Sequence, residues 1–153
     1  DVVSAQDMFN AVMAEIDTTD IIIATAAVAD YRPSVVAAEK IKKQTSDTMT
    51  LELVKNPDII ASVAALERRP FTVGFAAETQ HVEQYAHEKM QRKKLDMMVA
   101  NDVSQSTIGF ASDDNAATVF WRGGQQDFPV MSKHQLAEKI VRVIAEQTTQ
   151  NNK

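Results

Sequence analysis

Hydrophobic positions follow two different spacings along the chain, and this predicts an alternation of helices and strands. Apolar side chains that recur at helical spacing indicate helices, and the short continuous apolar runs between them indicate strands. The predicted helices are 4–16, 57–66, 79–94 and 132–147, and the predicted strands are 20–25, 71–77 and 95–100. This order is typical of a parallel sheet with helices on both faces. The strand at 20–25 is an unbroken apolar run, so we expect it to be buried on both faces.

The predicted helices begin at side chains whose oxygen atoms can cap free backbone amides. Ser4 is a candidate N-cap, and Asp7 is the candidate returning partner in a capping box. The other helices follow candidate caps of the same chemical kind, namely Asn56, Thr79 and Ser132. The helix starts therefore rest on capping chemistry as well as on apolar spacing.

The segments between and beyond these elements give weaker patterns. Residues 30–47 show no strong periodicity, so we expect a long loop, which in a compact domain is usually functional or disordered. Residues 49–54 alternate loosely and are a candidate strand, and residues 118–130 predict a β-hairpin. The polar residues 148–153 are expected to fray at the end of a single domain formed by residues 1–147.

The composition excludes several classes of function. The chain has 153 residues, no cysteine and a formal net charge of -5. A net negative charge argues against a general nucleic-acid binder, which usually presents a basic face. Without cysteine there is no disulfide, thiolate nucleophile or thiolate metal site. No apolar run reaches the roughly 18 residues that span a bilayer, so we expect a cytoplasmic protein without membrane or nucleic-acid partners.

A candidate anion site lies where the first predicted strand ends. Ala26 and Ala27 are small, so a ligand can approach the backbone at the strand end where open α/β sheets bind ligands. Asp30 follows them, and the lysine-rich segment 40–43 comes next. A divalent cation can bridge a carboxylate and a phosphate while lysines neutralise the remaining charge. Taken singly, Asp30 is as readily a turn residue, and the lysines are solvated loop charges.

Two further features suit a phosphorylated ligand but have simpler structural explanations. The helix start is expected to place Pro57 at the first helical position and Asp58 in the first turn, which presents free amides and a positive dipole end. Every helix has such an end. Lys89 and Lys93 lie one turn apart on one predicted helix, and their simplest interpretation is an exposed basic stripe.

Other sequence features are absent or uninformative. Phe75 ends a predicted strand and is more readily a core residue than a base-stacking platform. The four glycines form no GxGxxG turn or P-loop, and no GxSxG elbow is present. The histidines lack a spacing with carboxylates that would indicate zinc, and we expect all of them on the surface: His81, His87 and His134.

Reasoning from the residues therefore predicts an α/β domain that binds a phosphorylated ligand, and it leaves two classes of function open. One is a nucleotide-dependent enzyme, such as a transferase or an oxidoreductase of Rossmann-like topology. The other is a non-catalytic domain that senses a nucleotide. The absence of GxGxxG counts against the oxidoreductase.

Five segments, taken together and in order, resemble the phosphopantothenate–cysteine ligases, also called phosphopantothenoylcysteine synthetases. Each segment alone is common, but five in register between residues 20 and 120 are specific. The resemblance implies a Rossmann-like α/β fold with a mainly parallel sheet flanked by helices, followed by a C-terminal β-hairpin and helix. The segments are 26–31 (AAVADY), 40–43 (KIKK), 55–59 (KNPDI), 74–79 (GFAAET) and 100–103 (ANDV).

The family resemblance also implies a reaction of coenzyme A biosynthesis. A ligase of this kind joins 4′-phosphopantothenate to L-cysteine and consumes CTP in the bacterial type. The substrate carboxylate attacks the α-phosphate of CTP to give an acyl-cytidylate and pyrophosphate. The cysteine amine then attacks the activated carbonyl and releases CMP, so the product is 4′-phosphopantothenoylcysteine.

The resemblance assigns roles to particular residues. Ala26 and Ala27 would lie against the pantothenate end of the substrate, and Asp30 would organise Mg²⁺. Lys40 and Asp30 would be the catalytic residues, with Lys40 neutralising charge that builds on the α-phosphate. The CTP-binding residues that the resemblance implies are Ala24, Thr25, Ala26, Asp30, Lys40, Pro57, Asp58, Ile59, Ile60, Phe75, Lys89 and Lys93.

Partners also follow from the family resemblance. Such domains typically form the C-terminal half of a bifunctional protein whose other half is a flavin-dependent decarboxylase, so FMN would belong to that fused domain and not to this chain. A homodimer is implied, with the hairpin at 116–130 as a candidate contact. The family's glycine-rich nucleotide turn and an asparagine needed for the second step precede the region matched here, so we expect the N-terminal part of the domain to be missing from this chain.

The role implied for Lys40 gives a first prediction. Lys40→Ala should slow acyl-cytidylate formation and leave the fold intact, because the ammonium group acts on charge that develops in the transition state. Pyrophosphate release in the presence of CTP and 4′-phosphopantothenate measures this step. An unchanged rate of release would contradict the role.

Overall fold

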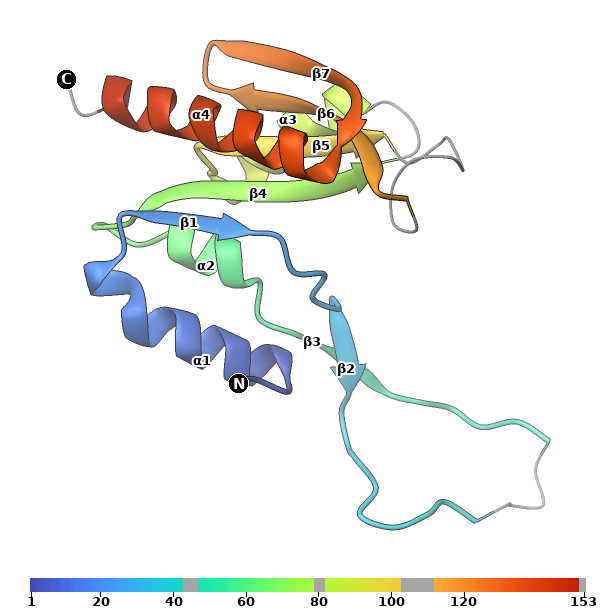
Figure 1. The fold of residues 1–153 in the computed structure, drawn as a ribbon. Helices are drawn as coiled ribbons and strands as arrows, with labels where there is room; N and C mark the ends of the chain where they lie inside the picture. The colour runs from blue at the N-terminus through green and yellow to red at the C-terminus, as the bar shows by residue number, and fades with distance from the viewer. Residues whose placement is uncertain (43–46, 79–81, 103–111, 152–153) are drawn as a thin grey trace.

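The computed structural model describes residues 1–42, 47–78, 82–102 and 112–151, and its centre is a five-stranded mixed sheet. The strand order is β1-β4-β5-β6-β7 (Figure 1). Strands β1, β4 and β5 run parallel to one another, and β6 pairs antiparallel with β5 on one side and with β7 on the other. The strands are β1 (Ile21–Ala24), β4 (Phe71–Glu78), β5 (Met97–Asp102), β6 (Asp114–Trp121) and β7 (Gly124–Ser132). The predicted Rossmann-like fold with a C-terminal hairpin is confirmed.

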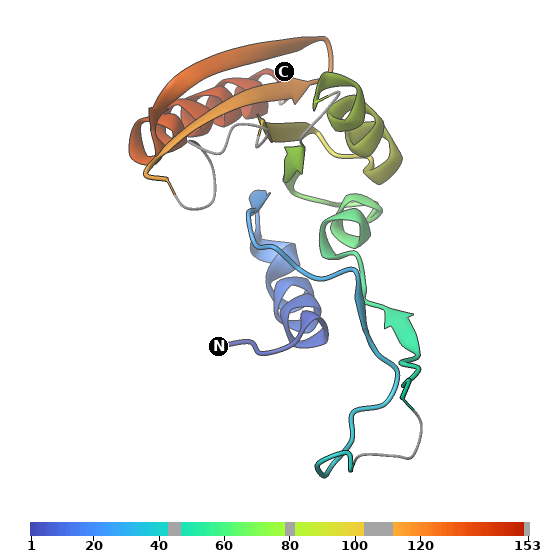
Figure 2. The same cartoon turned by 90° about the vertical axis from the view of Figure 1, so that its right-hand side faces the viewer.

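Helices cover both faces of the sheet. Helix α4 packs on one face, whereas α2 and α3 pack on the other, and α1 lies beside α2 (Figures 1 and 2). The helices are α1 (Ala5–Glu15), α2 (Ile59–Ala64), α3 (Val82–Lys93) and α4 (Lys133–Asn151), and a short 3₁₀ turn η1 (Ile16–Thr18) follows α1. In the described part of the chain, none of these helices is long and apolar enough to cross a bilayer.

Two hydrophobic cores follow from this layering, because successive residues of a strand point to opposite faces. Each core joins the inward face of its helices to alternate residues of the strands. The core under α4 includes Val73, Met97, Val99, Val119, Phe128, Leu136, Ile140 and Ile144. The core under α2 and α3 includes Ile60, Ala64, Ala86, Met90, Leu95, Met98 and Phe120. The sheet is thus fixed from both sides around β5.

Strand β1 differs from the prediction that it is buried on both faces. Ile21 and Ile23 are 39% and 42% exposed, whereas Ile22 packs against the core under α2 and α3. The exposed pair shares a face with Val73, since β1 and β4 are parallel and in register. Helix α4 lies over β6 and β7, so it does not cover this end of the sheet.

A two-stranded arm projects from the body between β1 and α2 (Figures 1 and 2). Strands β2 (Tyr31–Pro33) and β3 (Leu53–Lys55) pair antiparallel. The expected loop at 30–47 therefore contains a strand, and the expected strand at 49–54 is wrong over most of its length. Met49 and Leu51 are 66% and 60% exposed, so their loose alternation does not correspond to a buried face. Cross-strand pairing, which the spacing of apolar residues does not record, forms the arm.

The predicted helix caps are confirmed at both ends of the chain. The Asp7 backbone N–H donates to Ser4 Oγ at 3.1 Å and the Ser4 backbone N–H donates to Asp7 Oδ2 at 2.9 Å, which completes the capping box. The Gln135 backbone N–H donates to Ser132 Oγ at 3.3 Å, so Ser132 caps α4. The frayed tail expected from residue 148 is wrong, because α4 continues through Asn151.

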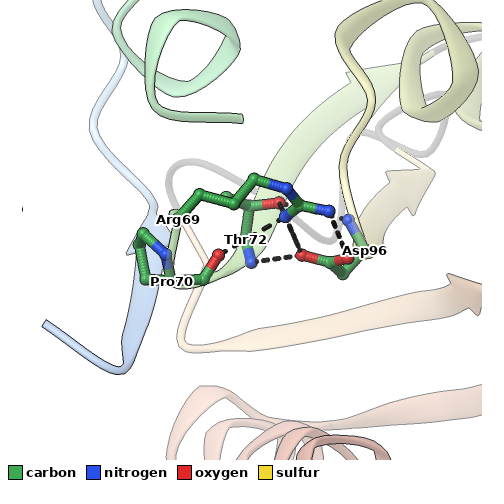
Figure 3. Close-up of polar contacts among 4 residues, drawn as sticks. All are labelled: Arg69, Pro70, Thr72 and Asp96. Atoms are coloured by element: carbon green, nitrogen blue, oxygen red, sulfur yellow. Dashed lines mark hydrogen bonds and ion pairs between the residues drawn. The ribbon is translucent and has the colours of Figure 1, made fainter. Parts of the chain in front are cut away.

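A charged network joins β4 to β5 at the end of the sheet where these strands begin (Figure 3). Arg69 makes a two-point ion pair with Asp96, and its Nη2–Oδ1 contact is 2.9 Å. The Asp96 carboxylate also accepts from the Thr72 backbone N–H at 2.8 Å and the Thr72 hydroxyl at 2.9 Å. Burial raises the pKa of Asp96, but the hydrogen bonds from Arg69 and Thr72 outweigh it and hold that pKa below its ordinary value.

This network makes stability depend on pH. The pKa of Asp96 is lower in the folded chain, so its contribution is present above the unfolded value of about 4 and is lost as the pH falls through the folded pKa. We expect Asp96→Asn to lower the free energy of unfolding at pH 7 by about 2 kcal/mol. The variant should also lose less stability than the parent chain between neutral and acid pH.

Urea unfolding at pH 7 and at pH 3 measures both effects. Asp113→Asn is the matched control, because Asp113 is an exposed aspartate that lies outside this network. Equal loss of stability for Asp96→Asn and Asp113→Asn would contradict the network's role.

Candidate functional site

A cavity of about 420 Å³ lies beyond the carboxyl end of β1. Its wall comes from α1, β1 and the segment that follows β1, the start of α2, β4, one face of α3, and Leu95 and Met98 near the start of β5. Eleven of the twelve predicted CTP-site residues line it together with Ala27, and the exception is Lys40. The predicted residues at the cavity are Ala24, Thr25, Ala26, Ala27, Asp30, Pro57, Asp58, Ile59, Ile60, Phe75, Lys89 and Lys93. Residues far apart in the sequence are thus brought together at one strand end.

Apolar side chains form part of the cavity wall, and they can pack closely against β4 because residue 74 is a glycine. Gly74 of β4 lines the cavity beside Leu95 and Met98. A Cβ atom on Gly74 would lie 2.7 Å from Leu95 Cδ1 and 3.3 Å from Met98 Cε. Leu95 and Met98 therefore pack against the backbone of β4, and a side chain at position 74 would push them away.

Phe75 contacts both the hydrophobic core and the cavity. It is half-buried and packs against the core under α4, as a core residue does. It also lines the cavity, together with Ile23 of β1. An aromatic side chain in this position is anchored by the core while it remains available to a ligand.

The start of α2 differs from the prediction. Asp58 is the N-cap, and its Oδ1 accepts from the Ala61 backbone N–H at 3.2 Å. Helix α2 begins at Ile59, so Pro57 is not at the first helical position and Asp58 is not in the first turn. The Asn56 side chain does not cap the helix, because its Oδ1 accepts from Arg32 Nη1 at 3.1 Å and its Nδ2 donates to the Ala29 carbonyl at 2.8 Å. The predicted cap, Asn56, is therefore wrong, because its side chain is engaged by tertiary contacts and Asp58 caps the helix instead.

Two lysines and two aspartates provide the charges of the cavity wall. Lys89 and Lys93 face the cavity from α3, so they are more than an exposed stripe. Lys93 Nζ lies 2.9 Å from Asp58 Oδ2, and this ion pair joins α3 to the start of α2. Asp30 lies at the cavity where the chain leaves for the arm. The wall can therefore bind a ligand that carries both negative charge and metal-bridging oxygens.

Lys40 is not brought to the cavity. It is an exposed residue of the arm and is absent from the cavity wall.

The histidines were all expected on the surface, and the structure confirms this for His134, which is exposed. The expectation is wrong for His87, which is half-buried and whose ring lies edge-on to Phe120 with centroids 4.9 Å apart. His81 and Thr79 lie outside the described residues.

The acidic residues fit Mg²⁺ only together with a phosphorylated ligand. Among the described residues, no group of three or more histidine, cysteine or acidic side chains is placed to hold a metal ion. Asp30 and Asp58 line the cavity, and Asp58 is paired with Lys93. Mg²⁺ is commonly held by one or two carboxylates plus substrate phosphates and water, so Asp30 is a suitable protein ligand.

Several residues at the cavity escape the sequence reasoning. Met8 and Val12 of α1, Ile22 of β1, and Leu95 and Met98 line it beside the predicted residues. The only sequence signal for these positions is apolar spacing, which also describes ordinary core residues.

The double role of Asp58 gives a prediction about stability. Asp58→Ala should lower the free energy of unfolding by about 1 kcal/mol, because it removes the cap of α2. Asp58→Asn keeps a capping oxygen and loses only a partly exposed ion pair, so its loss should be smaller than that of the alanine variant. Urea unfolding compares the two variants. An equal loss would show that the ion pair with Lys93, rather than the cap, stabilises this corner.

Comparison with known proteins places the chain in a family. Residues 1–148 match the family described as DNA/pantothenate metabolism flavoprotein C-terminal domain. The chain is 59% identical over 149 residues to the coenzyme A biosynthesis bifunctional protein CoaBC of Vibrio cholerae, covering 96% of this chain and 37% of that protein. The protein of the same name from Escherichia coli K12 is 49% identical over 156 residues, covering 100% of this chain and 38% of that protein. The chain therefore spans less than two fifths of the length of these relatives.

Solved structures agree with this placement. The crystal structure of the C-terminal domain of coenzyme A biosynthesis bifunctional protein CoaBC matches with a TM-score of 0.76 and 32% identity, covering 99% of this chain and 65% of that one. The DNA/pantothenate metabolism flavoprotein from Streptococcus pneumoniae has a TM-score of 0.74 at 19% identity, covering 96% of this chain and 69% of that one, which supports the fold alone. By sequence and by fold, the chain belongs to the DNA/pantothenate metabolism flavoprotein C-terminal domain family.

Proposed function

We propose that this chain is a phosphopantothenate–cysteine ligase domain that uses CTP. One observation carries the proposal: eleven of the twelve residues that the family resemblance assigns to CTP come from four separate stretches of sequence, yet they line one cavity. The family membership and the similarity to bifunctional proteins of coenzyme A biosynthesis support the same reaction.

In the proposed complex, the base and the phosphates of CTP occupy different parts of the cavity wall. The backbone and side chains of residues 57–60 would contact cytosine, with Phe75 packing beside it. Lys89 and Lys93 would bind phosphate oxygens from α3. Lys93 would exchange its bond to Asp58 for a bond to phosphate, and a charge-assisted contact of this kind is among the stronger hydrogen bonds in proteins.

The small residues after β1 suit the acid substrate. Ala26 and Ala27 would let the 4′-phosphopantothenate carboxylate approach the α-phosphate without steric hindrance. Asp30 would hold Mg²⁺, which would neutralise negative charge on the nucleotide phosphates when bound. The carboxylate forms a bond to the α-phosphorus while the bond to the pyrophosphate leaving group breaks. The L-cysteine amine then bonds to the acyl carbon, and CMP leaves with the electron pair of the acyl–oxygen bond.

The proposed catalytic role of Lys40 requires the arm to lie near a cavity during the reaction. Lys40 lies outside the cavity wall of its own chain in this structure. The arm also carries apolar side chains that are largely in solvent, including Val35 and Val36, which are 80% and 83% exposed. We propose a homodimer that covers such surfaces, with the arm a stronger candidate contact than the hairpin at 116–130, where Val130 is 54% exposed.

The longer relatives suggest a further part of the assembly. They are called bifunctional and extend well beyond the region matched by this chain. We propose that the domain works in fusion or association with a flavin-dependent phosphopantothenoylcysteine decarboxylase. That enzyme would bind FMN and consume the product of this domain in the cytoplasm.

Nucleotide binding tests the proposal. Titration calorimetry with Mg²⁺ should show binding of CTP that is stronger than binding of ATP or UTP. Lys89→Ala and Lys93→Ala should each weaken CTP binding by about tenfold or more, since each removes a charge-assisted contact to phosphate. Lys139→Ala is the matched control, because Lys139 is an exposed lysine on α4 away from the cavity.

Turnover separates the ligase from a domain that only senses a nucleotide. The protein should release pyrophosphate from CTP in the presence of 4′-phosphopantothenate, and CMP after L-cysteine is added. Selective CTP binding without either product, also in the full-length protein, would favour the sensor. No nucleotide binding in the full-length protein would overturn the assignment.

A further inference from the structure

The arm joins the body through a narrow neck next to the cavity. The chain leaves the body after Asp30 and returns at Asn56, and the Asn56 backbone N–H donates to the Asp30 carbonyl at 2.8 Å. Immediately beyond this bond, Tyr31 pairs with Lys55, and the β2–β3 ladder begins. Asp30 and Asn56 both line the cavity, so the neck is also part of the cavity rim.

The side chain of Asn56 bridges two parts of this neck. Its Nδ2 donates to the carbonyl of Ala29, at 2.8 Å, which fixes the segment that follows β1. Its Oδ1 accepts from Arg32 Nη1 at 3.1 Å, and the same nitrogen donates to the Lys55 carbonyl at 2.8 Å. The Asn56 amide thus connects the cavity segment to Arg32 of β2, and Arg32 in turn bonds to Lys55 of β3.

We propose that Asn56 is a positioning residue for nucleotide binding, and that Arg32 supports it from the arm. The inference rests on the proposed function, but it names residues that the family resemblance does not assign to CTP. Asn56 is held by the Ala29 carbonyl and the Asp30 carbonyl, so its position sets the backbone just before and at Asp30. It also precedes Pro57 and Asp58, so the same residue places both sides of the cavity rim.

The hydrogen bonds of Asn56 and Arg32 lie at the cavity rim and not in the parts of the structure that stabilise the whole fold. Neither hydrophobic core includes Asn56 or Arg32, and the helix cap of α2 is supplied by Asp58 instead. Loss of the Asn56 side chain should therefore leave the sheet and its helices in place. Residues 29–32 should then sample a wider range of positions in the free protein. CTP binding would have to order these residues, and this cost should lower the affinity for CTP.

Two measurements on Asn56→Ala test the proposal. CTP binding measured by calorimetry with Mg²⁺ should weaken by about tenfold, while the thermal unfolding midpoint stays that of the parent chain. Backbone amides of residues 29–32 should exchange hydrogen faster without ligand, while those of α4 should not change. Asn10→Ala is the matched control, because Asn10 is an exposed asparagine whose Oδ1 accepts from Gln6 Nε2 at 3.1 Å on α1.

Conservative variants separate the two halves of the bridge. Asn56→Asp keeps an oxygen for Arg32 and loses the donor to the Ala29 carbonyl, so exchange should rise at residues 29–30 and much less in the arm strands. Arg32→Lys keeps a donor and should bind CTP better than Arg32→Ala. Asn56→Asp also keeps the experiment decisive if the alanine variant does not fold.

The possible results are distinguishable. Parent-like CTP binding by Asn56→Ala, or faster exchange spread evenly over the chain with a lower unfolding midpoint, would overturn the positioning role. If the parent protein itself binds no CTP, the proposed function fails, and the exchange pattern still decides whether Asn56 holds the rim in place.

Discussion

The register between β4 and β5 depends on Asp96, and the position of the cavity depends on that register. The Asp96 carboxylate accepts from the backbone and hydroxyl of Thr72 immediately before the paired residues begin, and Arg69 neutralises its charge. From there Gly74 lies opposite Met98 and Phe75 opposite Val99. A shift by one residue would turn every side chain of β4 to the other face. The cavity wall would then lose both the glycine contact and the aromatic side chain.

The fold could be predicted from the sequence where local signals and burial agree. The alternation of strands and helices, the box at Ser4 and the cap at Ser132 are all determined by neighbours along the chain. Predictions failed where a distant contact overrides a local preference. Asn56 and Asp58 are both residue types that suit a helix cap, but only the folded chain shows that the Asn56 side chain is bonded to Arg32 and to the Ala29 carbonyl.

The residues of the candidate site also come from distant parts of the sequence, so local patterns alone did not identify them. Family resemblance named the cavity residues from four separate segments, and the parallel order of β1 and β4 explains why they meet. Apolar spacing alone would have left Phe75 and the pair Lys89 and Lys93 as ordinary core and surface residues. The arm strands could not be predicted, because their apolar residues Tyr31 and Leu53 are both exposed, so burial imposes no periodic pattern on β2 and β3.

The ion pair between Lys93 and Asp58 has a consequence for selectivity. A ligand anion that approaches Lys93 competes with a carboxylate already 2.9 Å away, and it gains only the difference between the two interactions. A monovalent ion such as chloride offers no more charge than the carboxylate that it displaces. A polyphosphate offers several charges and can contact Lys89 at the same time. We therefore expect the ion pair between Lys93 and Asp58 to favour polyphosphates over monovalent anions at the cavity.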